Sequence, residues 1–379
     1  MKIKWFLLAF MMLHCLSVSA QDLQALKNKL SELGFENINV LPDKIENDTL
    51  RFIVGLEHRS LNNPLDIVAL AKLVASDYGL RKITVVVQKR GQNMFMVEDH
   101  AKNIFSTVND NIARDLNRNF SINKYRLNVF YLPDVGIRFG YFDNPIQAKI
   151  NVLLGTELLL GRGLSLFTTV AIPVSNDLDN ENRGVGIGPT YLEYFNQFIP
   201  NNYLLISTGL FFDNRYGFDF QYRFYPFDSQ LSLGLNYSYT GFYYFPKSSI
   251  YFEAVKDQMV LLDAEYYFRM INSSVLVQVG RFLDQQLGVY FEVNKQYRNI
   301  ELGLFGVSNE RGFNAGFQFM IPLIPNKIFR TKHLEFRGKE DYRWSYSFSN
   351  EGQIGGRFSN SFNLTQGLRR FNYNLFNQR

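Results

Sequence analysis

The chain has 379 residues, enough for two or three domains, and combines 16% aromatic residues with a single cysteine. Its formal net charge of +5 is spread along the chain, so no continuous basic patch indicates a nucleic-acid partner. After residue 20 no uninterrupted apolar run reaches the length of a membrane-spanning helix, which excludes helical membrane proteins.

Residues 1–20 have the pattern of a secretory signal peptide. Lys2 and Lys4 precede an apolar run, and the small residues before Gln21 form a cleavage site. A lipoprotein signal at Cys15 is the alternative, but the residue before a modified cysteine is normally small and here it is His14. We therefore expect cleavage after residue 20, which leaves an exported mature chain without disulfides.

Residues 21–97 predict a small α+β domain, which we expect in the periplasm. Leucines recur at helical spacing before Gly34, and Asn63-Pro64 supplies the N-cap and first-turn proline of a second helix. The domain is expected to have the order α-β-β-α-β-β, with strands near 38–41, 50–56, 83–88 and 93–97.

Residues 98–123 are polar and predict a helical linker. Four apolar residues four positions apart give only a narrow apolar stripe, so a second core is not expected here. These residues are Ile104, Val108, Ile112 and Leu116.

From residue 124 to 348 the sequence repeatedly alternates apolar with polar residues. In the segment 215–224 aromatic residues take every second position, and Gly217, Asp219, Gln221 and Arg223 fill the gaps. A period of two indicates strands with one apolar and one polar face. A soluble sandwich would bury the aromatic face, whereas an outer-membrane barrel would turn it toward lipid. Because such faces recur along the whole region, we predict a mostly β protein with an antiparallel transmembrane β-barrel of about 12–14 strands.

The polar faces of these strands predict a lumen lined by charged and amide groups. Asp263 and Glu265 lie two apart on one such face, and Arg269 and Arg281 are expected to complete a charge network with them. The lumen-facing polar candidates are Asp219, Gln221, Arg223, Asp263, Glu265, Arg269 and Glu292.

Residues 349–379 form a polar C-terminal tail rich in Asn, Ser, Phe and Arg. Either the Trp344 segment is the closing strand and the tail lies in the periplasm, or the tail plugs the lumen. These alternatives arise because the chain does not end in the terminal aromatic strand that barrels often have, and we favour the first.

The sequence contains no constellation that indicates catalysis. His58, His100 and His333 lie in three different regions without metal-ligand spacing, and no nucleophile elbow is present. We therefore expect no enzyme activity, no metal and no cofactor. Thr49 is a candidate glycosylation site, because the stretch Asn47-Asp48-Thr49-Leu50 contains an Asn-x-Thr pattern and an Asp-Thr-Leu pattern.

About half of the chain, from Leu132 to Pro325, resembles the YjbH family of outer-membrane proteins associated with exopolysaccharide production. The resemblance rests on moderately specific motifs, and this chain is shorter than other members. The matching segments are Asn144-Pro145, AIPVSNDLDN at 171–180, Gly209 with Arg215-Tyr216-Gly217, GRFLDQQLG at 280–288 and NERGFNAGFQFMIPL at 309–323.

The resemblance implies a non-catalytic barrel in the outer membrane of a Gram-negative bacterium, acting in exopolysaccharide export or surface assembly. Its expected partners are outer-membrane lipid, a polysaccharide and periplasmic export proteins. The alternative is a structural or interaction protein of the outer membrane with a closed lumen, whose periplasmic domain binds a partner.

Overall fold

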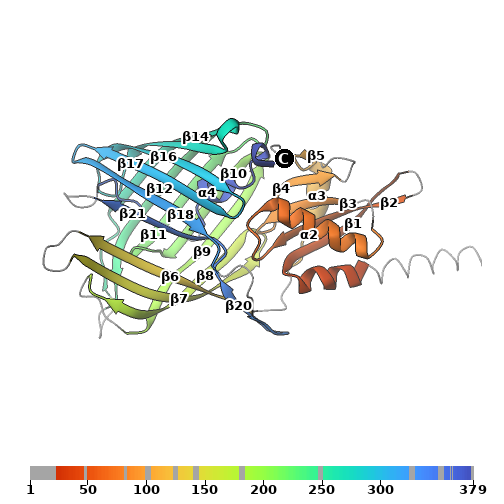
Figure 1. The fold of residues 1–379 in the computed structure, drawn as a ribbon, viewed down its shortest axis with the longest axis horizontal. Coiled ribbons are helices and arrows are strands. Elements are labelled where there is room, and N and C mark those ends of the chain that lie inside the picture. Colours follow the sequence, from red (N-terminus) through yellow and green to blue (C-terminus); the bar gives the residue numbers. More distant parts are fainter. Residues whose placement is uncertain are drawn as a thin grey trace, which may run out of the picture. The chain divides into compact units, whose positions relative to one another are not determined.

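The computed structural model divides the chain into two compact units, Met1–Asn123 and Lys124–Arg379 (Figure 1). The predicted signal peptide and positions 47–48 of the glycosylation motif lie outside the described residues. The structure describes residues 23–46, 49–80, 83–98, 104–122, 127–139, 145–178, 184–245, 251–323, 329–348, 354–358, 360 and 362–376.

The first unit contains a five-stranded sheet in the order β1-β2-β3-β4-β5. Asn63 caps the second helix by accepting a hydrogen bond from the Leu65 amide, and this helix connects two parallel strands, β2 and β3. The β3–β4 hairpin turns at Arg90 and Gly91, both at positive φ. The elements are a helix at 23–32, β1 (Phe35–Glu46), β2 (Thr49–His58), α2 (Pro64–Asp77), β3 (Ile83–Lys89), β4 (Gln92–Glu98), β5 (Ile104–Ser106) and α3 (Asp110–Arg118).

Helix α3 packs on this sheet, which corrects the prediction of a linker at 98–123. Leu116 is fully buried and clusters with Ile53, Val86 and Met96 of the strands. Another part of the predicted linker forms the edge strand β5. The narrow apolar stripe therefore covers a sheet face and belongs to the first unit.

The second unit is a sixteen-stranded sheet within the described residues. Consecutive long strands pair antiparallel, and β20 pairs parallel with β6. Sixteen strands exceed the predicted 12–14, and three of them, β13, β19 and β20, have only two to five residues. The strands are β6 (Leu127–Phe139), β7 (Ile146–Gly161), β8 (Leu164–Asn176), β9 (Gly186–Ile199), β10 (Asn202–Leu210), β11 (Arg215–Phe224), β12 (Leu231–Tyr244), β13 (Tyr251–Phe252), β14 (Asp257–Phe268), β15 (Ser273–Arg281), β16 (Leu287–Tyr297), β17 (Ile300–Asn309), β18 (Gly312–Ile321), β19 (Phe329–Arg330), β20 (Leu334–Gly338) and β21 (Tyr342–Phe348).

The two faces of this sheet have opposite chemistry. On β14, Leu262 is 58% exposed while its neighbour Asp263 is 6% exposed. The alternation places apolar side chains on the outer face and polar side chains on the enclosed concave face, which we call the interior. Exposed apolar residues of the outer face include Leu231, Leu233, Val260, Leu262, Val277, Val279, Leu287, Val289, Phe291, Leu302, Leu304 and Phe317.

The sheet curves until β21 lies beside β6, but strand pairing does not join these two strands within the described residues (Figure 1). Side chains bridge them instead. The indole Nε1 of Trp344 donates to the carbonyl oxygen of Val135 over 2.7 Å, and the rings of Phe139 and Tyr346 meet edge to face. We call this junction the seam.

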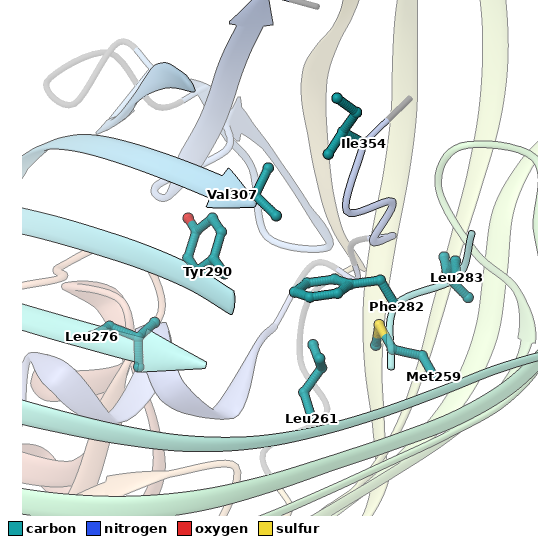
Figure 2. Packing of buried hydrophobic residues seen from close by; sticks show 8 residues of the cluster. All are labelled: Met259, Leu261, Leu276, Phe282, Leu283, Tyr290, Val307 and Ile354. Carbon is teal, nitrogen blue, oxygen red and sulfur yellow. The ribbon is translucent and has the colours of Figure 1, made fainter. Parts of the chain in front are cut away.

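Apolar residues also occur in the interior, where they pack against a segment from the C-terminal tail. Figure 2 shows Ile354 of the tail together with Tyr290, Val307 and Phe282 of the sheet and its loops. The whole cluster comprises Met259, Leu261, Leu276, Phe282, Leu283, Tyr290, Val307 and Ile354. In the described part of the chain, none of the helices is long and apolar enough to cross a membrane.

Candidate functional site

The described part of the C-terminal tail occupies the interior of the sheet, which corrects the prediction that the tail lies in the periplasm. The tail contains two short helices, α4 (Leu364–Arg369) and α5 (Tyr373–Phe376), and Figure 1 shows α4 among the strands. The ring of Phe358 stacks on Phe211, and the amide of Leu283 donates to the carbonyl oxygen of Gly356 over 3.0 Å. The plug interpretation is therefore the correct one of the two, and we call residues 354–358, 360 and 362–376 the plug.

Arg223 on β11 joins three strands to the plug. Its guanidinium donates to Asp263 Oδ1 over 2.6 Å and to Glu265 Oε2 over 3.0 Å, both on β14. It also donates to Ser232 Oγ and Thr365 Oγ1, each over 2.8 Å. Arg223 is 1% exposed. A guanidinium has five N–H donors in a fixed plane, so this one residue can fix the position of α4 relative to β11, β12 and β14.

Arg369 at the end of α4 makes a second cluster with carboxylates from three strands. It binds Glu265 of β14, Glu292 of β16 and Glu301 of β17, and the contact between Nη2 and Glu292 Oε1 is 3.1 Å. Arg343 of β21 donates to the other oxygen of Glu301 over 2.8 Å. We call the strands that surround the plug the wall. The guanidinium of Arg369 thus neutralises carboxylates of the wall that would otherwise be buried together without a partner.

Electrostatics keep this plug arginine charged. Burial alone lowers the pKa of the Arg369 guanidinium, but the carboxylates of Glu265, Glu301 and Glu292 hold it well above its usual value. The plug also carries Arg357, whose guanidinium lies 3.6 Å from the centre of the Tyr290 ring and donates to Gln278. Positive charge on the plug thus complements the buried carboxylates of the wall.

Amide groups make a third contact between wall and plug. Gln221 Nε2 donates to Asp219 Oδ2 over 2.8 Å, and its Oε1 accepts from the backbone amide of Leu364 over 2.8 Å. Asn360 of the plug donates to the same Asp219 oxygen over 3.2 Å. These contacts satisfy the first backbone donor of α4, so the wall acts as part of its N-terminal cap.

Most of the predicted lumen-facing residues lie in the interior. Asp219, Gln221, Arg223, Asp263, Glu265 and Glu292 are all buried there. Arg269 is the exception, because it lies in a 3-10 turn (Arg269–Ile271) after β14 and is exposed. Arg281 is exposed as well. The cations of the network are therefore Arg223, Arg343 and Arg369, and not the expected Arg269 and Arg281.

Sequence reasoning missed Glu301, Thr365 and Arg369. Glu301 lies between Ile300 and Leu302 in an alternating strand, so its inward direction follows from the same period of two. The two plug residues carry no such signal, because the tail has no strand or long helix periodicity. Thr49, the candidate glycosylation site, begins β2 and pairs with Glu46.

The plug leaves a cavity of about 930 Å³ in the interior. One side consists of β6 and β21 at the seam, and the opposite side of strands β11 to β18 together with the plug. Its polar lining is rich in amides: Gln221, Asn236, Gln278, Asn314, Gln318, Asn360, Asn363 and Gln366. Its aromatic lining comprises Phe139, Phe212, Tyr290, Phe305, Phe319, Tyr342, Trp344, Tyr346 and Phe358.

Lys339 lies at the edge of this cavity, between β20 and β21. Its amine is 3.4 Å from Asp341, 3.7 Å from Glu340 and 3.8 Å from Glu157. Burial alone lowers the pKa of Lys339, but Asp341, Glu340 and Glu157 raise it to about 12. This cation is therefore neutralised by several carboxylates at the end of the seam.

The groups that line the cavity can bind a ligand. Among the described residues, no group of His, Cys, Asp or Glu side chains has the geometry of a metal site. The cavity instead offers amide donors and acceptors beside aromatic rings, a combination that can bind hydroxyl groups and the apolar faces of a ligand. Neither a model of a known protein family nor a curated protein sequence matches this chain.

Proposed function

We propose that the protein is an outer-membrane β-barrel that acts, without catalysis, in the export or surface assembly of an exopolysaccharide. The observation that carries the membrane part of this proposal is the inverted sheet. Its outer face bears exposed apolar side chains on strand after strand, and its interior bears buried charges. A water-soluble protein rarely exposes so much contiguous apolar surface, whereas lipid requires it.

The polysaccharide part rests on two supports. The segments within Leu132 to Pro325 resemble the YjbH family, which is associated with exopolysaccharide production. The interior cavity of about 930 Å³ combines amides with aromatic rings, as a ligand rich in hydroxyl groups requires. In this proposal the amides hydrogen-bond to sugar hydroxyls, and the first unit meets export proteins in the periplasm.

A second candidate function is favoured by the plug. Arg369 fixes the plug through buried ion pairs, and Arg223 adds a hydrogen bond to Thr365. A fixed plug supports a structural or interaction protein with a closed lumen. In that case the first unit binds a partner, and no polymer passes through the lumen.

Cell fractionation and a deletion strain test the first proposal. The protein should be recovered in the outer-membrane fraction with its N-terminus after residue 20. Deletion of the gene should reduce surface polysaccharide while cytoplasmic sugar-nucleotide pools stay unchanged. A soluble periplasmic protein would contradict the membrane assignment, and normal surface polysaccharide would contradict the export role.

Conductance in a planar bilayer separates the two functions. The intact protein is compared with a chain that ends at residue 353 and therefore lacks the plug, and heat-modifiable migration in gels checks that both have folded. A gated export channel should conduct little when intact and clearly more without the plug. Equal, negligible conductance of both folded chains would favour the closed interaction protein.

A further inference from the structure

The cavity extends from the interior of the sheet to the seam between β6 and β21. In a paired sheet, only every second residue of a strand faces the interior. Here every residue from Leu132 to Phe139 on β6 lines the cavity, and so does every residue from Tyr342 to Ser347 on β21. Both strands therefore present their edges, as well as one face, to the same space.

Strand edges are costly in a membrane. The N–H and C=O groups of an edge need hydrogen-bond partners, and hydrocarbon supplies none. From Pro133 onward β6 has no paired neighbour on the seam side within the described residues, and the Val135 carbonyl accepts from an indole instead. Such an edge is tolerated where it lines a polar space or binds a polar ligand.

Aromatic rings line the seam from the outer surface to the cavity. Trp344 and Tyr346 of β21 register with Phe319 and Phe317 of β18. Phe317 is exposed, whereas Trp344 is half-buried and packs against the interior cluster that contains Phe130. Phe139 of β6 packs against Tyr346 across the seam. An acyl chain that enters the seam from the surrounding lipid would contact these rings.

The inner side of the seam is polar and has unused acceptors. Asn314 is 4% exposed and lines the cavity, and its amide oxygen accepts no hydrogen bond from the described part of the protein. The same holds for the amide oxygen of Asn360 on the plug. Two acceptors aimed into a cavity are suited to hydroxyl donors.

The charges around the cavity favour an uncharged head group. Arg343 is paired with Glu301, and Lys339 is surrounded by carboxylates. Arg357 lies over the Tyr290 ring and donates to Gln278. Because Arg343, Lys339 and Arg357 already have partners, a phosphate head group that binds any of these three would have to displace those partners.

We propose that the seam is a lateral binding site for an amphiphile with a hydroxyl-rich, uncharged head group, such as a lipid-linked saccharide. The acyl chain lies along Phe139, Trp344 and Tyr346, and the head group binds the amides of the cavity. This proposal rests on the membrane insertion in the proposed function and deepens it, because it identifies the substrate as lipid-linked and its entry as lateral.

Tryptophan fluorescence can test this site directly. The chain has two tryptophans, Trp5 and Trp344, so a Trp5→Phe variant of the full chain reports only from the seam. The probe is dodecyl maltoside with bromine in its alkyl chain, which quenches tryptophan on contact, added to the protein in unbrominated zwitterionic micelles. The reference probes are chain-brominated dodecylphosphocholine and a chain-brominated anionic alkyl phosphate.

We expect the maltoside to quench Trp344 at a mole fraction about tenfold lower than the phosphocholine does. Unbrominated dodecyl maltoside should reverse the quenching. Equal quenching by all three probes would show ordinary lipid contact and overturn the site. Preferred quenching by the alkyl phosphate would overturn the assignment of an uncharged head group.

Two variants distinguish binding of the head group in the cavity from general contact with the surrounding micelle. Asn314→Leu should remove most of the preference for maltoside, while Asn196→Leu, the same change away from the cavity, should leave it intact. A preference unaffected by Asn314→Leu would contradict binding of the head group in the cavity.

A cross-link tests lateral entry. Phe139→Cys with Tyr346→Cys, in a Cys15→Ala background, places two thiols across the seam, and a short bis-thiosulfonate reagent joins them. The cross-linked protein should lose the maltoside preference and regain it after reduction. A preference that persists in the cross-linked protein would overturn the seam as the entrance. These outcomes are independent of the deletion strain, so the seam site and the export role can fail separately.

Discussion

Arg223 Nη1 donates to Thr365 Oγ1 over 2.8 Å, although 142 positions separate the two residues in the chain. The same guanidinium binds two carboxylates of β14, so a single side chain connects the wall of the sheet to the plug. Breaking a buried ion pair by removing one partner leaves an uncompensated charge, which costs more than the pair contributes. Arg369 of the plug pairs with the same Glu265, so the stability of the second unit should depend on its C-terminal residues.

Arg369→Met should strongly destabilise the second unit. The change leaves Glu265, Glu292 and Glu301 buried without their shared guanidinium, and we expect a loss of about 3–5 kcal/mol in the free energy of unfolding. Urea unfolding in detergent micelles measures this. Arg281→Met, at an exposed arginine, is the matched control and should change little.

A double variant checks the cause of that loss. Adding Glu301→Gln to Arg369→Met removes one of the stranded charges, so part of the lost stability should return. If the two changes destabilise additively, the charges are not coupled and the ion-pair explanation is wrong.

Gly234→Ala should displace Asp263 from Arg223. A Cβ atom at position 234 would lie 2.3 Å from Asp263 Oδ2, closer than side-chain atoms approach. Because Asp263 is buried and fixed by Arg223, we expect a loss of about 1–3 kcal/mol in unfolding free energy. At Gly186 nothing lies within 4 Å of such a Cβ, so Gly186→Ala should be nearly neutral in the same urea titration.

Leu262→Arg should be costly if the outer face contacts lipid. Leu262 is 58% exposed near the middle of β14, and an arginine near the membrane midplane costs about 2–4 kcal/mol. Gln318→Arg, at a half-buried residue that lines the cavity, is the comparison and should cost less. Folding titrations in lipid vesicles give both values. Similar costs at the two positions would indicate that water surrounds the outer face.

Removal of the first unit should preserve the second only if the cut is placed after α3. A chain lacking residues 23–123 should still form the folded sheet with its plug, since the contacts of Arg223 and Arg369 lie wholly within the second unit. A chain lacking 23–97 keeps α3 without the strands that cover Leu116, so we expect lower yield and protease-sensitive material. Limited proteolysis distinguishes the two chains, and equal resistance would contradict the boundary at residue 123.

The sequence by itself determined which side chains of each strand share a face. The period of two in segments such as 215–224 places Asp219, Gln221 and Arg223 together, because successive side chains of a strand point to opposite faces. All three are buried in the interior, and their neighbours Phe218 and Phe224 are exposed. Local geometry alone produces this result, so no knowledge of distant contacts was needed.

Only the tertiary structure decided which partners meet in the interior. Arg269 and Arg281 are close to Asp263 in sequence, yet the strand ends carry both to exposed positions, and Arg223 and Arg369 take their place. The tail has no periodicity that points to a neighbour, and its location follows from charge complementarity with carboxylates on three strands. Alternation specifies a face but not the residue across it, because hydrogen bonds between distant segments depend on the register and curvature of the whole sheet.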